Sequence, residues 1–229
     1  MNYFQLLTRL YAIYKNNRGK TLTSLEIVRR IKRAVNSSDI KVKGIDSISI
    51  LGNRFDISGI YESELDFDGK PPIGIELLFP SHKTAFLLDE SDLTENHWLM
   101  MSIDVASVIG HEYIHMKQAR RRHFNECRSY KSNSKNLALR EQQEYYGNSD
   151  EVDAYAYTLA VALINQIAFE NRKKISITKT QMYKIYRHYF GKDSEIVKRL
   201  IKKSKTYYRH LEREYYDFYN ENGIFRRIE

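Results

Sequence analysis

Two histidines and a glutamate within residues 107–118 have the types and the spacing for metal chemistry. The stretch reads SVIGHEYIHMKQ, in which His111 and His115 are four residues apart and Glu112 follows the first of them. On an α-helix, residues i and i+4 share one face, so both imidazoles can point at one ion while the glutamate reaches a water molecule on it. This H-E-x-x-H pattern is typical of a catalytic zinc site.

The surroundings of the pattern have to support it, because chance produces it in about one of a hundred chains with this number of histidines. From 97 to 122 the sequence predicts one helix without proline, and the part before His111 is strongly apolar. A buried helix of this kind suits a metal site. The alternative is a surface helix on which two histidines flank an ordinary glutamate.

A hydrolytic zinc usually takes three protein ligands and keeps its fourth position for water. We predict Glu151 as the third ligand, because it begins a hydrophobic helix expected over 149–171. A competing interpretation is a helix cap, in which Glu151 bonds back to the backbone of Asn148. The other candidates for a third ligand are His123, Glu126, Cys127, Glu141 and Glu144.

The pattern His111-Glu112-x-x-His115 followed by Glu151-x-x-Ala154 resembles the zincin metallopeptidases whose third ligand is a glutamate on a second helix. It is also similar to small intracellular H-E-x-x-H proteins of bacteria and phages. The resemblance covers about residues 97–165. It implies Zn²⁺ as the cofactor, held by the two histidines and Glu151, with Glu112 as the general base that activates the metal-bound water.

The chain departs from the family at Tyr155, where such proteins often have an aspartate that is hydrogen-bonded to the first histidine. The tyrosine hydroxyl could replace that aspartate in a catalytic role. The same side chain could equally be a core tyrosine. Both interpretations stay open at this point.

The activity that the resemblance implies is hydrolysis of peptide bonds in an intracellular protein substrate, by a metalloendopeptidase. We expect an edge strand over 73–79 to hold the peptide by backbone pairing. The residues that could donate a hydrogen bond to the oxyanion are Tyr145, Tyr146, Tyr155, Tyr157, Arg187 and His188.

Two other functions compete with a general peptidase. One is a basic nucleic-acid-associated or virion-associated protein that keeps a zincin scaffold without turnover. The other is a protease that acts on DNA-bound or regulatory proteins. The net charge of +8 favours weak contacts with nucleic acid or acidic proteins, although the basic faces predicted over 23–35 and 194–219 are better explained as solvated faces of packed helices.

Composition bounds the remaining possibilities. A chain of 229 residues with 42% hydrophobic residues can bury one core, so we expect a single domain over 1–229. Its one cysteine excludes a disulfide framework and a cysteine-rich zinc site. No signal peptide is evident, and the longest apolar run, 98–109, is too short to span a bilayer. We therefore expect a cytoplasmic protein (host cytoplasm or virion if phage-encoded) without a membrane partner.

The expected fold class is α+β, a mostly helical zincin-like fold with a small, mainly antiparallel sheet of about four strands beside the active-site helix. Helices are expected within 1–40, over 97–122 and 149–171, and within 178–219. Thr23 to Glu26 form a predicted capping box, and Thr94 or Asn96 should cap the metal helix. The apolar runs that predict strands are 45–51, 54–61, 73–79 and 84–88.

Overall fold

The structure is a computed structural model that describes residues 2–47, 55–127, 129–170 and 176–222. The fold class is α+β, as expected, with eight α-helices and five strands in those residues. The chain divides into two compact units, Met1–Met116 and Lys117–Glu229. The helix α4 (Glu95–Arg121) passes through the boundary between them. A single domain over 1–229 stays a prediction.

The helices of the first unit begin at side-chain caps that the sequence encodes. Asn2 accepts the backbone N–H of Gln5 and starts α1 (Tyr3–Asn17). The predicted capping box is confirmed at α2 (Ser24–Val35), where Thr23 and Glu26 bond to each other's backbone. Of the two expected caps of α4, Thr94 is the one that accepts a backbone N–H, from His97 at 3.2 Å.

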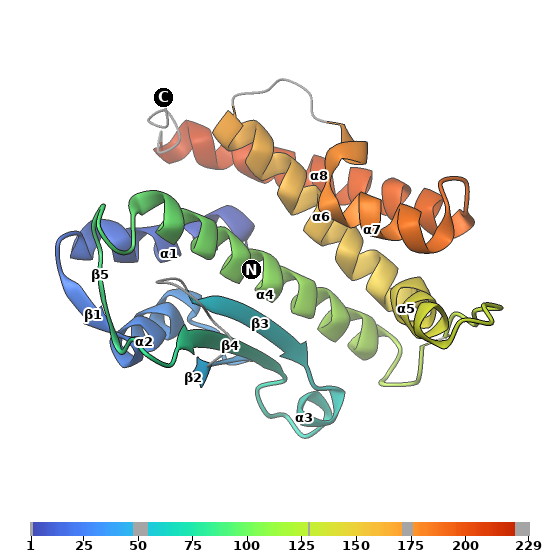
Figure 1. The fold of residues 1–229 in the computed structure, drawn as a ribbon, viewed down its shortest axis with the longest axis horizontal. Coiled ribbons are helices and arrows are strands. Elements are labelled where there is room, and N and C mark those ends of the chain that lie inside the picture. The colour runs from blue at the N-terminus through green and yellow to red at the C-terminus, as the bar shows by residue number, and fades with distance from the viewer. Residues whose placement is uncertain (1, 48–54, 128, 171–175, 223–229) are drawn as a thin grey trace. The chain divides into compact units, whose positions relative to one another are not determined.

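The main sheet of the first unit has three strands in the order β2-β4-β3 (Figure 1). Strand β2 (Ile40–Ser47) runs parallel to β4 (Ile73–Pro80), and β3 (Asp56–Tyr61) runs antiparallel to it. The short helix α3 (Ser63–Phe67) connects β3 to β4. Because β4 alternates fully buried apolar residues with half-buried ones, it takes the central position.

The sheet differs from the expectation in three ways. The four expected strands do not form one sheet, because β5 (Ala85–Leu87) pairs with β1 (Thr21–Thr23), a short strand that the sequence pattern did not predict. The strand expected from 45 already begins at 40, and its pairing with β4 is parallel. The parts of two expected strands over 48–54 lie outside the described residues.

Aromatic packing fixes the first turns of α4 in the unit. The ring of Trp98 lies 6.4 Å from both Phe55 and Tyr14, measured between ring centroids. Its indole N–H donates to the carbonyl of Leu10 in α1 at 2.9 Å. Trp98 is only 1% exposed. A rigid helix anchored at its start also holds the side chains three and four turns further along.

The regular secondary structure in the described part of the second unit is helical. After the end of α4 it contains α5 (Leu137–Gly147), α6 (Ser149–Glu170), α7 (Gln181–Phe190) and α8 (Glu195–Asn222). The helix expected from 178 begins at Gln181, after the 3₁₀ turn Ile177–Lys179. Among the described residues, no helix combines the length and the apolar character that a membrane crossing requires.

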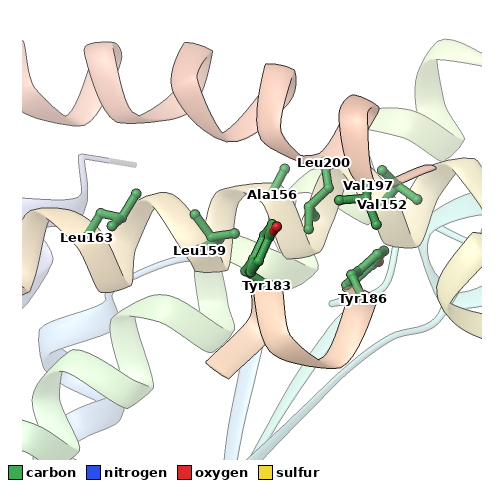
Figure 2. Packing of buried hydrophobic residues seen from close by; sticks show 8 residues of the cluster. All are labelled: Val152, Ala156, Leu159, Leu163, Tyr183, Tyr186, Val197 and Leu200. Atoms are coloured by element: carbon green, nitrogen blue, oxygen red, sulfur yellow. The ribbon is translucent and has the colours of Figure 1, made fainter. Parts of the chain in front are cut away.

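The core of the second unit lies where α6, α7 and α8 meet (Figure 2). The buried residues of this cluster come at helical spacing from each of the three helices. They are Val152, Ala156, Leu159, Leu163, Tyr183, Tyr186, Val197 and Leu200. The cluster holds α6, and with it the start of that helix, in a fixed position within the unit.

Candidate metal centre

Helix α4 brings two predicted ligands together. The Nε2 atoms of His111 and His115 lie 3.1 Å apart, and their ring planes are inclined by 69°. Two nitrogens bound to one tetrahedral zinc at about 2.05 Å would be separated by about 3.3 Å. The observed separation therefore matches what one shared ion needs, and it arises from one turn of a single helix.

Burial also keeps the first histidine in the form that binds metals. It lowers the pKa of His111 to about 3, and the neighbouring His115 acts in the same direction. Because only the neutral imidazole offers a lone pair to a metal, His111 is ready to bind near neutral pH.

The predicted general base, Glu112, is buried against strand β3 and is only 9% exposed. A Cβ atom at Gly59 of β3 would lie 2.3 Å from Val108 Cγ1 and 3.1 Å from Glu112 Cγ. Only glycine therefore allows β3 to approach the helix so closely. The sequence pattern did not single out Gly59, although a glycine inside a strand pattern is a known sign of such an approach.

Strand β3 also replaces the edge strand that was expected over 73–79. That prediction is wrong, because β4 is hydrogen-bonded to β2 on one side and to β3 on the other. In the part of the chain that the structure describes, β3 lies at the edge of this sheet (Figure 1). Its Gly59 lies close to the Glu112 side chain.

The predicted third ligand, Glu151, lies in the first turn of α6 in the second unit. Burial raises the pKa of its carboxyl to about 7, and a hydrogen bond with the Tyr145 hydroxyl acts in the opposite direction. Tyr145 is on α5 and is 49% exposed. A buried carboxylate with a phenol beside it can serve as a ligand whose orientation is fixed by its neighbour.

The helix cap at this position uses another side chain. The Asn148 side chain accepts the backbone N–H of Asp150 at 3.0 Å, and the Asn148 carbonyl accepts that of Val152. The first turn of α6 therefore has acceptors other than Glu151. The Asn148 backbone N–H, which the cap interpretation pairs with Glu151, donates to the Tyr145 carbonyl at 3.2 Å. The ligand role of Glu151 stays a prediction.

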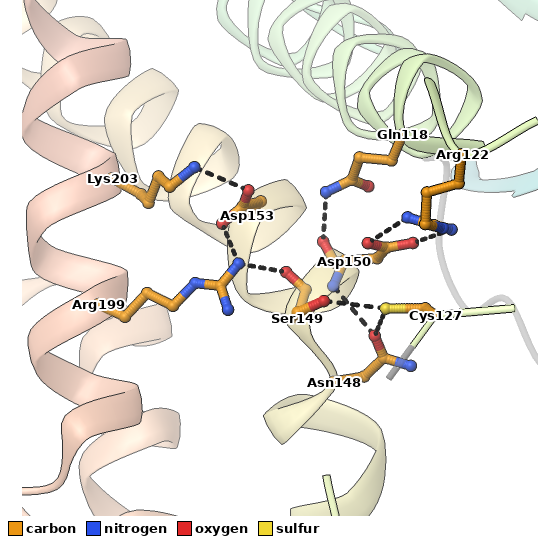
Figure 3. A network of polar contacts seen from close by, with 9 residues as sticks. All are labelled: Gln118, Arg122, Cys127, Asn148, Ser149, Asp150, Asp153, Arg199 and Lys203. Atoms are coloured by element: carbon orange, nitrogen blue, oxygen red, sulfur yellow. Dashed lines mark hydrogen bonds and ion pairs between the residues drawn. The ribbon is translucent and has the colours of Figure 1, made fainter. Parts of the chain in front are cut away.

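The acidic neighbours of Glu151 point in different directions (Figure 3). The carboxylate of Asp150 forms a two-point ion pair with Arg122, at 2.8 and 2.6 Å. Asp153 pairs with Arg199 and Lys203 of α8, at 3.1 and 3.0 Å. Both aspartates have cationic partners of their own, and they stabilise the position of α6.

Tyr155, predicted as a catalytic residue, packs in an aromatic group. Its ring centroid lies 5.3 Å from that of Tyr146 and 6.1 Å from that of Tyr186. Its hydroxyl is 3.3 Å from the hydroxyl of Tyr145. Burial raises its pKa, so the phenol stays neutral. These contacts fit a core tyrosine, and its role in catalysis stays a prediction.

Some of the rival residues have structural roles in the second unit. The Cys127 thiol contacts the side chains of Asn148 and Ser149, at 3.3 and 2.9 Å, just before α6. Glu144 accepts the backbone N–H of Ser132. Tyr145, one of the candidate oxyanion donors, has a hydrogen bond to Glu151.

Comparisons with known proteins add no evidence on the function of the chain. No family model, no curated protein and no solved structure matches the chain. The resemblance to zincins therefore rests on the H-E-x-x-H pattern and the glutamate of the second helix alone.

Proposed function

We propose that the chain is a zinc-dependent metallopeptidase in which His111, His115 and Glu151 hold one ion and Glu112 is the general base. The observation that carries the proposal is the 3.1 Å separation of the two histidine nitrogens, with a buried glutamate in the same helical turn.

The continuity of α4 is a second support. Residues 111, 115, 118 and 122 follow at the spacing that shares one helix face. Beyond His115 on this face, Gln118 donates to the backbone carbonyl of Asp150, and Arg122 pairs with the carboxylate of the same residue. Within the second unit, Gln118 and Arg122 thus hold Asp150, the residue directly before Glu151.

The donor set suits the chemistry of the proposed reaction. Two neutral imidazoles and one carboxylate are a ligand set that zinc takes in hydrolases. When bound, zinc lowers the pKa of its water and polarises a substrate carbonyl. The Glu112 carboxylate would take a proton from the attacking water and pass it to the leaving amine. The edge strand β3 would hold the peptide in extended form by backbone pairing.

Metal content tests the ligand set. The protein should be loaded with zinc, separated from free metal and measured by mass spectrometry. We expect about one zinc per chain, lost in His111→Ala. His123→Ala is the matched control, because His123 was the alternative histidine ligand, and it should keep its zinc. Zinc retained in His111→Ala would overturn the proposal.

Cleavage tests the reaction separately. A mixture of peptides of varied sequence is incubated with the zinc-loaded protein, and new termini are identified by mass spectrometry. Glu112→Gln should keep zinc and cleave about 10²- to 10⁴-fold more slowly. Stoichiometric zinc without cleavage would support a zincin scaffold without turnover instead.

A further inference from the structure

A pocket of about 210 Å³ lies in the first unit, between the start of β3 and the first turns of α4. Its buried side chains are apolar, namely Phe55, Leu93, Trp98 and Met101. Its exposed side chains include Asp56, Met100 and Asp104. The pocket therefore has an apolar floor and two carboxylates at its rim.

The pocket opens on the helix face that carries the histidines. Met100, Asp104, Val108 and His111 follow at intervals of four, four and three residues, which keeps them on one face of α4. Asp104 precedes His111 by seven residues, or about 10 Å along the axis. An extended peptide advances about 3.3 Å per residue, so this distance corresponds to about three substrate residues.

Strand β3 connects the pocket to Glu112. Directly before its first residue, Phe55 packs against Trp98, with 6.4 Å between the ring centroids. Further along, Gly59 approaches Val108 and Glu112. A peptide paired with the edge of β3 would therefore pass both the general base and the pocket.

We propose that this pocket binds the side chain of a lysine or arginine in the peptide substrate, about three residues from the cleaved bond. This inference rests on the proposed function and names its substrate class. The aliphatic stem would lie on Met100 and Met101, and the cationic end would reach Asp56 and Asp104.

The lining favours a cationic side chain over other ligands. The described lining residues include no lysine or arginine that could neutralise the two aspartates. Burial is the main cause that raises the pKa of Asp104, and the negative charge of Asp56 raises it further, so the two carboxylates repel each other. A cation between them would relieve this repulsion.

Two other occupants fit less well. A volume of about 210 Å³ is below the range of about 300–1,000 Å³ typical of sites for cofactors and drug-sized ligands. Among the described residues, Asp56, His97 and Asp104 also do not belong to a group whose ligand atoms are close enough to share a metal ion. A single amino-acid side chain is therefore the ligand that best fits the volume of the pocket.

Paired peptides test the preference. Internally quenched peptides that differ only by lysine or glutamine at one position are compared for cleavage by the zinc-loaded protein. We expect kcat/KM to be at least about tenfold higher with lysine at one position. The double variant Asp56→Asn, Asp104→Asn should lose this preference. Asp68→Asn, an exposed aspartate in the connection between β3 and β4, is the matched control and should keep it.

A binding measurement separates failure of this inference from failure of the proposed function. Trp98 is the only tryptophan and lines the pocket, so its indole N–H signal in NMR spectra reports binding there. The Glu112→Gln protein is titrated with Ac-Ala-Ala-Lys-Ala-Ala-amide and with the glutamine version. We expect the lysine peptide to shift the signal and the glutamine peptide to leave it unchanged. In a protein that also carries Asp56→Asn and Asp104→Asn, neither peptide should shift it.

The outcomes then have distinct meanings. A lysine-specific shift without any peptide cleavage would support the pocket while the peptidase proposal fails. Cleavage without a preference for lysine or arginine would overturn the pocket proposal and leave the peptidase intact. Equal shifts with both peptides, or none, would also overturn the pocket proposal.

Discussion

The two histidines and Glu151 are positioned by different kinds of structure. His111 and His115 lie on one helix, and their spacing follows from a single turn of α4. Glu151 has partners from another helix, since Tyr145 of α5 bonds to its carboxyl. The electrostatic effects also differ, because burial favours the neutral, metal-binding form of His111 but disfavours the charged, metal-binding form of Glu151.

This difference indicates that, in the proposed metal centre, the position of Glu151 is more easily disturbed than the spacing of the two histidines. A helix pair at i and i+4 keeps its spacing as long as the helix is intact. A buried carboxyl with a raised pKa has to lose its proton before it can bind a metal, and its orientation depends on neighbours in other elements. We therefore expect substitutions around Glu151 to change metal affinity in graded steps.

The largest effect is expected for the proposed third ligand itself. Glu151→Ala should weaken zinc binding by more than about 100-fold, because loss of a residue that only orients a ligand already costs about 10- to 100-fold. Competition with chelators of graded affinity measures this. Glu141→Ala is the matched control and should bind zinc normally. Equal affinities for both variants would exclude Glu151 as a ligand.

A smaller but still large effect is expected where β3 meets α4. Gly59→Ala should lower the free energy of unfolding by about 1–3 kcal/mol, because the new Cβ would overlap Val108. In Gly74→Ala, in the same sheet, the new Cβ would lie 3.1 Å from Ile60 Cγ2 and 3.9 Å from the Ile60 carbonyl, both farther than the 2.3 Å at Gly59, so the cost should be smaller. Urea unfolding of both variants checks the order. The reverse order would contradict the close approach of β3.

An intermediate effect on the metal is expected at the phenol beside Glu151. Tyr145→Phe removes the hydrogen bond to the carboxyl and should weaken zinc binding about tenfold. Tyr157→Phe is the control, because the Tyr157 ring packs against Tyr207, at 5.7 Å between centroids. If both variants bind zinc as tightly as the unmodified protein, Tyr145 does not orient the ligand.

The smallest effect concerns a carboxyl outside the metal centre, Asp104. Burial and the charge of Asp56 raise its pKa to about 6 from an ordinary value near 3.8. Its contribution to stability is therefore fully present below about pH 4 and is lost as the pH rises through 6. Asp104→Asn should raise the melting temperature at pH 7.5 by roughly 1–2 °C, since solvent screens this partly exposed group.

The pH comparison supplies its own control. At about pH 3, below the ordinary pKa of 3.8, the aspartate is mostly neutral in the folded and in the unfolded chain, so the two proteins should melt at nearly the same temperature. Asp56 and His97, the other titratable groups of the pocket, are unchanged between them. A stabilisation that is equal at both pH values would exclude titration of Asp104 as its cause.

Much of the local structure was predictable from sequence because it depends on short-range rules. The capping box of Thr23 and Glu26, the Thr94 cap and the course of α4 all follow from residues within one or two turns. The arrangement of strands was less predictable. Whether 73–79 forms a central or an edge strand depends on partners far away in the sequence, and this prediction was wrong.

The sequence by itself determined that His111 and His115 face one point with Glu112 beside them, because helical periodicity is a local property. Only the tertiary structure decided that β3 lies against Glu112 through Gly59, and that Tyr145 bonds to the Glu151 carboxyl. Strand order and side-chain packing depend on contacts between distant segments, whose pairing no spacing within a single element specifies.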